Sequence, residues 1–151
     1  MDAIQFLKRE HEKAKRAFGE ILQASGDQRG QLWKKLQPEL KVHEQVEEAG
    51  LYGPIAREIG SANPELNDWE QHHHEEVGEF ESLIQEINGL DPAGDEWVEK
   101  IEDAEEMLEH HIDEEEGTIW PQIQQVWDRS KLEQAGKQLE ALHKQKLQQA
   151  A

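Results

Sequence analysis

The apolar residues of this 151-residue chain recur at intervals of three and four positions over four long stretches. Short segments rich in glycine, proline, asparagine and aspartate separate these stretches. Such spacing places apolar side chains on one face of a helix, so it predicts four amphipathic α-helices and no strands. The first two helices are expected over about residues 2–25 and 28–49, and the other two over about 63–88 and 95–121.

Capping residues and helix breakers mark the ends of these helices. Asp2 and Asp95 are expected to cap the first and fourth helices, and Asn63 followed by Pro64 begins the third. The second helix is expected to loosen or end at a group of helix-breaking residues, which are Gly50, Gly53 and Pro54.

Four long helices joined by short loops predict an all-α, up-down-up-down four-helix bundle with a short C-terminal helix. The chain has about the length of one domain, so one hydrophobic core is expected. Residues 1–121 would form the bundle, and residues 122–151 would form a C-terminal helical extension packed on the same domain. The helix of this extension is expected to begin with a capping box, Ser130-Lys131-Leu132-Glu133.

Each predicted helix carries one histidine at a position where its stripe calls for an apolar residue. These histidines are His11, His43, His73 and His111. The second and fourth helices also place a glutamate one turn later, giving His43-x-x-x-Glu47 and His111-x-x-x-Glu115. Unpaired buried polar groups cost roughly 2–7 kcal/mol each, so six ionisable groups in one core need compensation. A bound metal centre would provide it.

The chain also looks internally duplicated, which suggests two metal ions. The two longer motifs are Leu40-x-x-His43-x-x-x-Glu47-Glu48-x-x-Leu51-Tyr52 and Leu108-x-x-His111-x-x-x-Glu115-Glu116-x-x-Ile119-Trp120. Residues four apart lie nearly one above the other on a helix, so each pair can present a nitrogen and an oxygen to one metal. Six ligands exceed the four of a tetrahedral zinc site, and a dinuclear iron site fits the count best.

Polar neighbours of three of these residues are alternative ligands. At about 100° per residue, His73 falls within the apolar arc of its helix, whereas the flanking histidines lie to either side. The same count favours His111 and Glu115 over their neighbours. The less favoured alternatives are His72, His74, His110, Glu114 and Glu116.

Composition excludes several classes of partner and site. The net charge of −18 argues against nucleic acid and against an anionic membrane surface as partners. The absence of cysteine excludes disulfides and thiolate metal sites, so nitrogen and oxygen must hold any metal. No signal-peptide pattern opens the sequence, and no apolar run reaches the ~20 residues that a membrane span requires. A cytoplasmic location is therefore expected.

The motifs at residues 43–48 and 111–116 resemble those of the hemerythrin-like family, also called HHE cation-binding domains, and the resemblance covers about residues 2–121. It implies a four-helix bundle around a non-haem di-iron centre, with two iron ions and a bridging oxo or hydroxo group. By motif, it implies six metal ligands, with the two glutamates as candidate bridges: His11, His43, Glu47, His73, His111 and Glu115.

One departure from the family pattern bears on function. Oxygen-carrying members typically have a second histidine one turn after the third-helix ligand, where this chain has Val77. An iron lacking that ligand would have an additional open position, unless His74 or Glu76 takes the place of the missing imidazole. The resemblance therefore implies a protein that binds or senses O2 or a related small oxidant, such as NO or peroxide. The alternatives are a di-iron enzyme with peroxidase or ferroxidase activity and a structural metal-binding interaction module. A sensor would signal through a protein partner, which the sequence does not identify.

Overall fold

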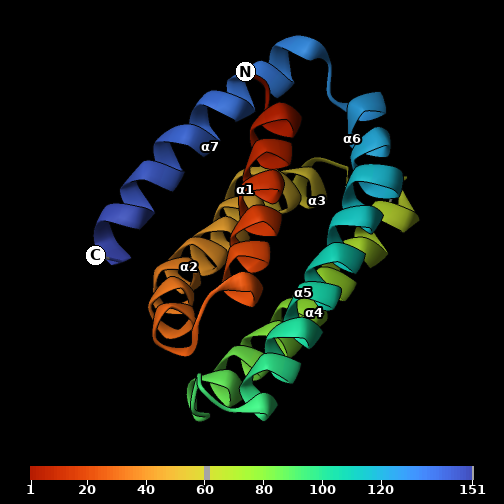
Figure 1. Ribbon diagram of the computed structural model, residues 1–151. Coiled ribbons are helices and arrows are strands. Elements are labelled where there is room, and N and C mark those ends of the chain that lie inside the picture. Colours follow the sequence, from red (N-terminus) through yellow and green to blue (C-terminus); the bar gives the residue numbers. More distant parts are fainter. Residues whose placement is uncertain (60–61, 151) are drawn as a thin grey trace.

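The computed structural model describes residues 1–59 and 62–150, and these residues form helices joined by short turns, without a strand (Figure 1). The predicted all-α helical bundle is thereby confirmed. The elements, in chain order, are α1 (Ala3–Gln23), α2 (Gly26–Glu47), η1 (Glu48–Tyr52), α3 (Gly53–Ile59), α4 (Pro64–Asn88), α5 (Asp95–Glu114), η3 (Glu115–Ile119), α6 (Trp120–Val126) and α7 (Arg129–Ala150). The segments η1 and η3 are single turns of π-helix.

The helix starts follow local hydrogen bonding. The Asp2 carboxylate accepts from the backbone N–H of Gln5 at 2.8 Å, and the Gln5 side chain accepts from the Asp2 N–H at 3.0 Å, which completes a capping box. The Asn63 side chain caps α4 ahead of Pro64, as expected. The expected cap of α5 is wrong, because Gly94 is the N-cap and Asp95 lies in the first turn. There its carboxylate still favours the helix N-terminus.

The second helix loosens at the expected group of helix-breaking residues but does not end there. The stretch around Gly50 forms the π-helical turn η1, and α3 then continues the helix to Ile59. Pro54 falls in the first turn of α3, where a missing amide N–H is tolerated. The expected end of the fourth helix at Pro121 is wrong, because η3 and α6 continue α5 to Val126.

Helix α7 is longer than the short C-terminal helix expected from the sequence. It has 22 residues, and Asp128 rather than Ser130 caps it by accepting from the Lys131 N–H at 2.8 Å. It packs against α1 and α2. The approach to α1 is so close that a Cβ at Gly136 would lie 2.7 Å from the carbonyl carbon of Asp2 and 2.9 Å from the nitrogen of Ala3.

The buried apolar residues form two clusters. One includes Leu7, Val46, Trp69 and Trp120, and it extends onto α7. The other includes Phe18, Leu40, Ile87 and Leu108. Each stripe histidine lies, along its helix, between residues of the two clusters, so the polar residues occupy a layer in the middle of the bundle.

The bundle is open along one side. Helix α1 packs against α2 and α5, and α4 packs against α5. Between α2 and α4, with the C-terminal end of α7 beside it, there is a groove of about 690 Å³. Val77, Phe80 and Ile84 line it and are therefore only partly buried, although the sequence pattern assigns them to the core stripe. No helix in the described part of the chain is both long enough and apolar enough to cross a membrane.

Candidate metal centre

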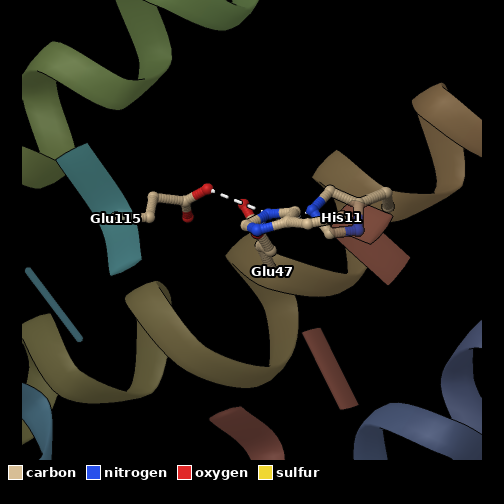
Figure 2. Close-up of side chains that lie close together, drawn as sticks. His11, Glu47 and Glu115 are labelled. Atoms are coloured by element: carbon tan, nitrogen blue, oxygen red, sulfur yellow. Dashed lines mark hydrogen bonds and ion pairs between the residues drawn. The ribbon is translucent and has the colours of Figure 1, made fainter. Parts of the chain in front are cut away.

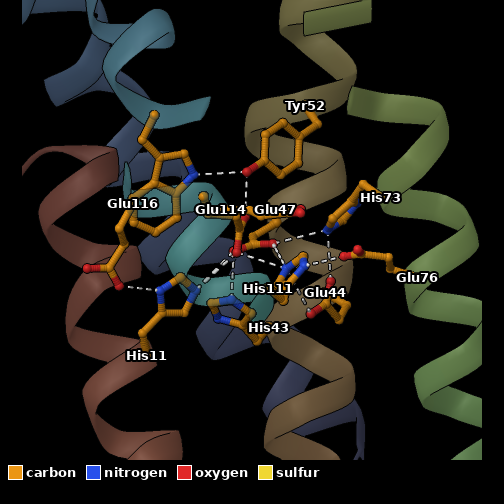
Figure 3. Close-up of polar contacts among 12 residues, drawn as sticks. His11, His43, Glu44, Glu47, Tyr52, His73, Glu76, His111, Glu114 and Glu116 are labelled. Carbon is orange, nitrogen blue, oxygen red and sulfur yellow. Dashed lines mark hydrogen bonds and ion pairs between the residues drawn. The ribbon is translucent and has the colours of Figure 1, made fainter. Parts of the chain in front are cut away.

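The six predicted ligand residues lie together in the polar layer, and Glu44 joins them (Figure 3). Their ligand atoms form two groups, and within each group all the atoms lie within 4.8 Å of one another. The first group contains His11, His43, Glu47 and Glu115, and the second contains Glu44, Glu47, His73 and His111. Because Glu47 belongs to both groups, the arrangement resembles two adjacent cation sites with a shared carboxylate.

The first group surrounds one oxygen of Glu47. Its Oε1 lies 2.7 Å from His43 Nε2 and 3.6 Å from His11 Nε2. Figure 2 shows His11 beside Glu47 and Glu115, and the distance from His11 Nε2 to Glu115 Oε1 is 3.3 Å. These distances are short enough for a single cation to contact the nitrogens and oxygens together after small side-chain movements.

The second group surrounds the other oxygen of Glu47. Its Oε2 lies 3.3 Å from His73 Nε2 and 3.9 Å from His111 Nε2. His111 Nε2 also lies 2.8 Å from Glu115 Oε1, which in turn contacts His11 of the first group. Both glutamates therefore lie between the two groups, and each can serve as a bridge.

Glu44 was not among the residues expected from the sequence. Its Oε2 lies 3.0 Å from His73 Nε2, and its Oε1 lies 3.9 Å from His111 Nε2. A signal existed in the sequence, because Glu44 precedes Glu47 by three residues and so shares its helix face. The chain has 34 acidic residues, and this single spacing did not distinguish Glu44 from the other carboxylates.

Each π-helical turn brings the side chain five residues after a glutamate into the same polar layer as that glutamate. Residues five apart on an α-helix point in directions about 140° apart. Here Tyr52 lies five residues after Glu47, and Trp120 lies five after Glu115, yet all four side chains are buried in the centre. The wider turns η1 and η3 make this possible.

Outer hydrogen bonds orient the imidazole rings. The Nδ1 of His11 donates to Glu116 at 2.8 Å, and the Nδ1 of His111 donates to Glu76 at 3.1 Å. Each bond leaves Nε2 as the inward-facing atom, the pattern that metal-binding histidines need. The Tyr52 hydroxyl donates to Glu115 Oε2 and accepts from the Trp120 N–H at 2.9 Å.

The charges in the layer are strongly coupled. Burial alone lowers the pKa of His11, but the Glu115 and Glu47 carboxylates close to its ring outweigh burial and raise the pKa to about 10. Burial likewise lowers the pKa of His73, and Glu44 and Glu47 raise it to about 10. Burial raises the pKa of Glu47, but His43 and the other histidines hold it well below its usual range. Without metal, the site therefore holds protons on its histidines, and a cation must displace them.

Most of the inward ligand atoms lack hydrogen-bond partners. Within the described residues, buried atoms without such a partner include His11 Nε2, His73 Nε2, His111 Nε2, Glu44 Oε2, Glu47 Oε2 and Glu115 Oε1. Orphaned buried polar atoms are costly, and coordination to a cation satisfies them. A set of imidazole nitrogens and carboxylate oxygens suits iron, manganese or zinc. The residues therefore fit a two-cation centre.

The alternative ligands lie outside the two groups. His72, His74 and His110 are exposed, with side-chain accessibilities of 49%, 60% and 67%, whereas His73 is 2% exposed. Glu116 contacts the outer nitrogen of His11, and Glu114 contacts His110 at the surface.

A cavity of about 150 Å³ adjoins the centre. Three histidines of the layer, His11, His43 and His111, line one part of it. Its apolar walls come from Ala14, Leu36, Leu40, Val77, Phe80, Met107 and Leu108. Leu40, Val77 and Phe80 also line the groove between α2 and α4, so the cavity and the groove share a wall.

Comparison with known proteins gives three findings. The model of the hemerythrin HHE cation-binding domain matches residues 2–123. The crystal structure of a hemerythrin HHE cation-binding domain-containing protein from Mycobacterium kansasii superposes with a TM-score of 0.82 at 23% identity, covering 99% of this chain and 90% of that one. A DNA nickase from Nostoc is 23% identical over 99% of this chain, which spans 41% of that protein's length.

Proposed function

Because this chain belongs to the hemerythrin HHE cation-binding family, we propose that it holds two iron ions and binds or senses O2 or a related small oxidant, such as NO or peroxide. The observation that supports two ions is the position of Glu47, whose two oxygens face separate groups of ligands. A single ion would leave one group of buried ionisable side chains without compensation.

Val77 supports an open position for a small ligand. It faces the cavity beside the histidines, at the place where oxygen-carrying relatives typically have another imidazole. An isopropyl group cannot coordinate, so one ion would have fewer protein ligands than in those carriers. Bound iron would supply the redox chemistry and the open position, and the apolar wall would select a small, weakly polar ligand.

The chain's own residues control access and protons. The cavity and the groove between α2 and α4 share Leu40, Val77 and Phe80, and these apolar side chains would suit the approach of a neutral diatomic molecule from this side. The cavity volume of about 150 Å³ leaves room for a diatomic ligand or for peroxide. The Tyr52 hydroxyl, held on Glu115, is the nearest buried O–H donor to the centre among the described residues.

Metal analysis and anaerobic spectroscopy test the proposal. Protein reconstituted with Fe²⁺ without oxygen is expected to hold about two iron atoms per chain and to change its near-ultraviolet and visible absorption when O2 or NO is added. One tightly held zinc with no second site, or a loaded centre that does not respond to O2, NO or peroxide, would contradict it and favour a structural metal.

Turnover is the second candidate function. The oxidisable pair Tyr52 and Trp120 lies against Glu115, and the cavity is larger than a diatomic ligand requires, which favours peroxide consumption or Fe²⁺ oxidation. Consumption of peroxide or Fe²⁺ well beyond two equivalents per chain would support an enzyme, and stoichiometric reaction would support binding or sensing.

DNA cleavage is outside the proposal. The Nostoc protein named a DNA nickase has more than half of its length beyond the match. A net charge of −18 also disfavours contact with a phosphate backbone, whose affinity for proteins comes largely from lysine and arginine.

A further inference from the structure

A second cluster of histidine and glutamate lies at the surface of α4 and α5, beside the buried centre. His72 and Glu76 are one turn apart on α4, with 2.7 Å between His72 Nε2 and Glu76 Oε1. Glu114 of α5 faces them, and its Oε2 lies 3.7 Å from His72 Nε2. One ligand atom from each of the three residues lies within 4.8 Å of the others. His72 is half exposed, so an ion in solvent can reach it directly.

The chemistry of this cluster suits a divalent transition metal. One imidazole nitrogen and two carboxylates form a mixed set that first-row ions accept readily. Within the described residues, the ion pairs of Glu76 and Glu114 involve histidines and no lysine or arginine. The Glu114 Oε2 atom is buried and has no hydrogen-bond partner. The cluster therefore combines negative charge with a carboxylate oxygen that is free to bind a cation.

A similar set on the other edge of α4 is less suited. It consists of Glu48, Glu70 and His74. Burial and Glu48 raise the pKa of Glu70, and the positive charge of Arg57 lies close enough to lower it in part. A fixed cation there competes with a metal ion.

Glu76 connects the surface cluster to the buried centre. One of its oxygens contacts His72, and the other accepts from the Nδ1 of His111 at 3.1 Å. His111 in turn presents Nε2 to the second buried group (Figure 3). A cation at the surface cluster is therefore one side chain away from a residue of the centre.

We infer that His72, Glu76 and Glu114 form a third, solvent-accessible site for a divalent transition-metal ion, through which ions are loaded into the buried centre. The inference rests on the proposed two-ion centre and concerns how that centre is filled. The transfer is an exchange of ligands, in which the cation moves from imidazole and carboxylates at the surface to imidazoles and carboxylates inside, without a change of oxidation state. The excess of 34 acidic over 16 basic residues raises the local concentration of cations around it.

Anaerobic Co²⁺ binding to the metal-free 151-residue chain tests the inference. Equilibrium dialysis is expected to show two tightly held ions and one weaker ion. The His72→Ala and Glu114→Gln variants are expected to lose the weaker ion and to retain the two tight ones. Stopped-flow absorption should show that they fill the buried centre at least about tenfold more slowly. Glu75→Gln, at an exposed position of α4, removes the same charge and should load at the wild-type rate.

Loading of both variants at the wild-type rate, or retention of the third ion in them, would overturn the inference. Failure of the proposed function has a different signature, because a normally loaded centre would then be unreactive toward O2, NO and peroxide. Both variants change partly exposed residues, and circular dichroism checks that they remain folded.

Discussion

Tyr52 and Trp120 occupy equivalent positions of the two repeated motifs, and they meet in the middle of the bundle, where the Trp120 N–H donates to the Tyr52 hydroxyl at 2.9 Å. The pair makes the duplicated site asymmetric. Tyr52 can donate onward to Glu115, whereas an indole at the equivalent place offers its only N–H to Tyr52. Glu47 and Glu115 are therefore held differently.

Tyr52→Phe tests this asymmetry. The variant is expected to retain metal but to leave the Trp120 N–H buried and unpaired, which costs about 1–3 kcal/mol of unfolding free energy. Glu115 loses its donor, so the visible spectrum of the iron-loaded protein should change. Trp127→Phe is the control, because it removes a hydrogen bond to Glu58 away from the centre. An unchanged spectrum in Tyr52→Phe would show that Tyr52 does not orient Glu115.

Glu44→Gln tests the ligand that the sequence did not reveal. The amide keeps the shape of the side chain but removes the charge facing His73 and His111. The affinity of this buried group of ligands for its metal ion should therefore fall about ten- to hundredfold. Competition with a chelator measures the change. Glu20→Gln, on the exposed face of α1, should have no effect. Equal affinities in the two variants would remove Glu44 from the site.

Val77→His tests the open position. An imidazole at this wall of the cavity is expected to coordinate the nearby ion and to slow oxidation of the Fe²⁺-loaded protein by O2, followed by stopped-flow absorption. Val77→Ile is the control, because it fills similar space in the cavity without adding a ligand atom. It separates coordination of the ion by the new imidazole from simple obstruction of the cavity. The hypothesis fails if Val77→His oxidises like the native protein while still binding two ions, or if native protein repeatedly binds and releases O2 with full recovery.

Metal binding near neutral pH is expected to release protons. His11 and His73 have pKa values of about 10 in the metal-free fold, so both are protonated at pH 7.5. Coordination requires neutral imidazole, so these two residues release about two protons, and the raised pKa values of His43 and His111 add to that number. Calorimetry of Co²⁺ binding in buffers with different ionisation enthalpies measures this number. A heat of binding that is the same in every buffer would contradict it.

The stability of the metal-free protein should follow the same groups. Raised histidine pKa values contribute stability that is fully present below about pH 6.5 and is lost as the pH rises through about 10. The lowered pKa of Glu47 contributes stability that is present above about pH 4.5 and is lost in acid. The melting temperature should therefore be highest between about pH 4.5 and pH 6.5. Metal adds stability by binding the folded state, and this gain should shrink as the pH falls. Equal melting temperatures with and without iron would contradict it.

Gly136→Ala tests how α7 is attached. A methyl group would collide with the backbone of Asp2 and Ala3, so unfolding free energy should fall by about 1–3 kcal/mol. Gly19→Ala is the matched substitution in α1, where nothing lies within 4 Å, and it should stabilise the helix by about 0.5–1 kcal/mol. Urea denaturation compares the two. Stabilisation by both substitutions would mean that the helix contact adjusts without cost.

The sequence by itself determined the four bundle helices and the layer of polar residues between them. The stripe of α5, from Trp97 through His111 to Glu115, is buried as its spacing predicts. Helical periodicity is a local property, so it specifies which side chains share a face before any packing is known. The two His-x-x-x-Glu pairs could be predicted from the sequence for the same reason.

Only the tertiary structure decided which carboxylates join that layer and where the bundle opens. Glu44 and Glu76 are two of many acidic residues. The contact of Glu44 with His73 depends on how α2 and α4 are placed, and the contact of Glu76 with His111 depends on how α4 packs against α5. Tyr52 reaches Glu115 through a π-helical turn that no spacing rule indicated. Phe80 and Val77 have core spacing but line a groove, because burial requires a facing helix and α2 stands apart from α4 there. A helix selects its inward face locally, whereas the neighbour that covers this face is set by the packing of the whole chain.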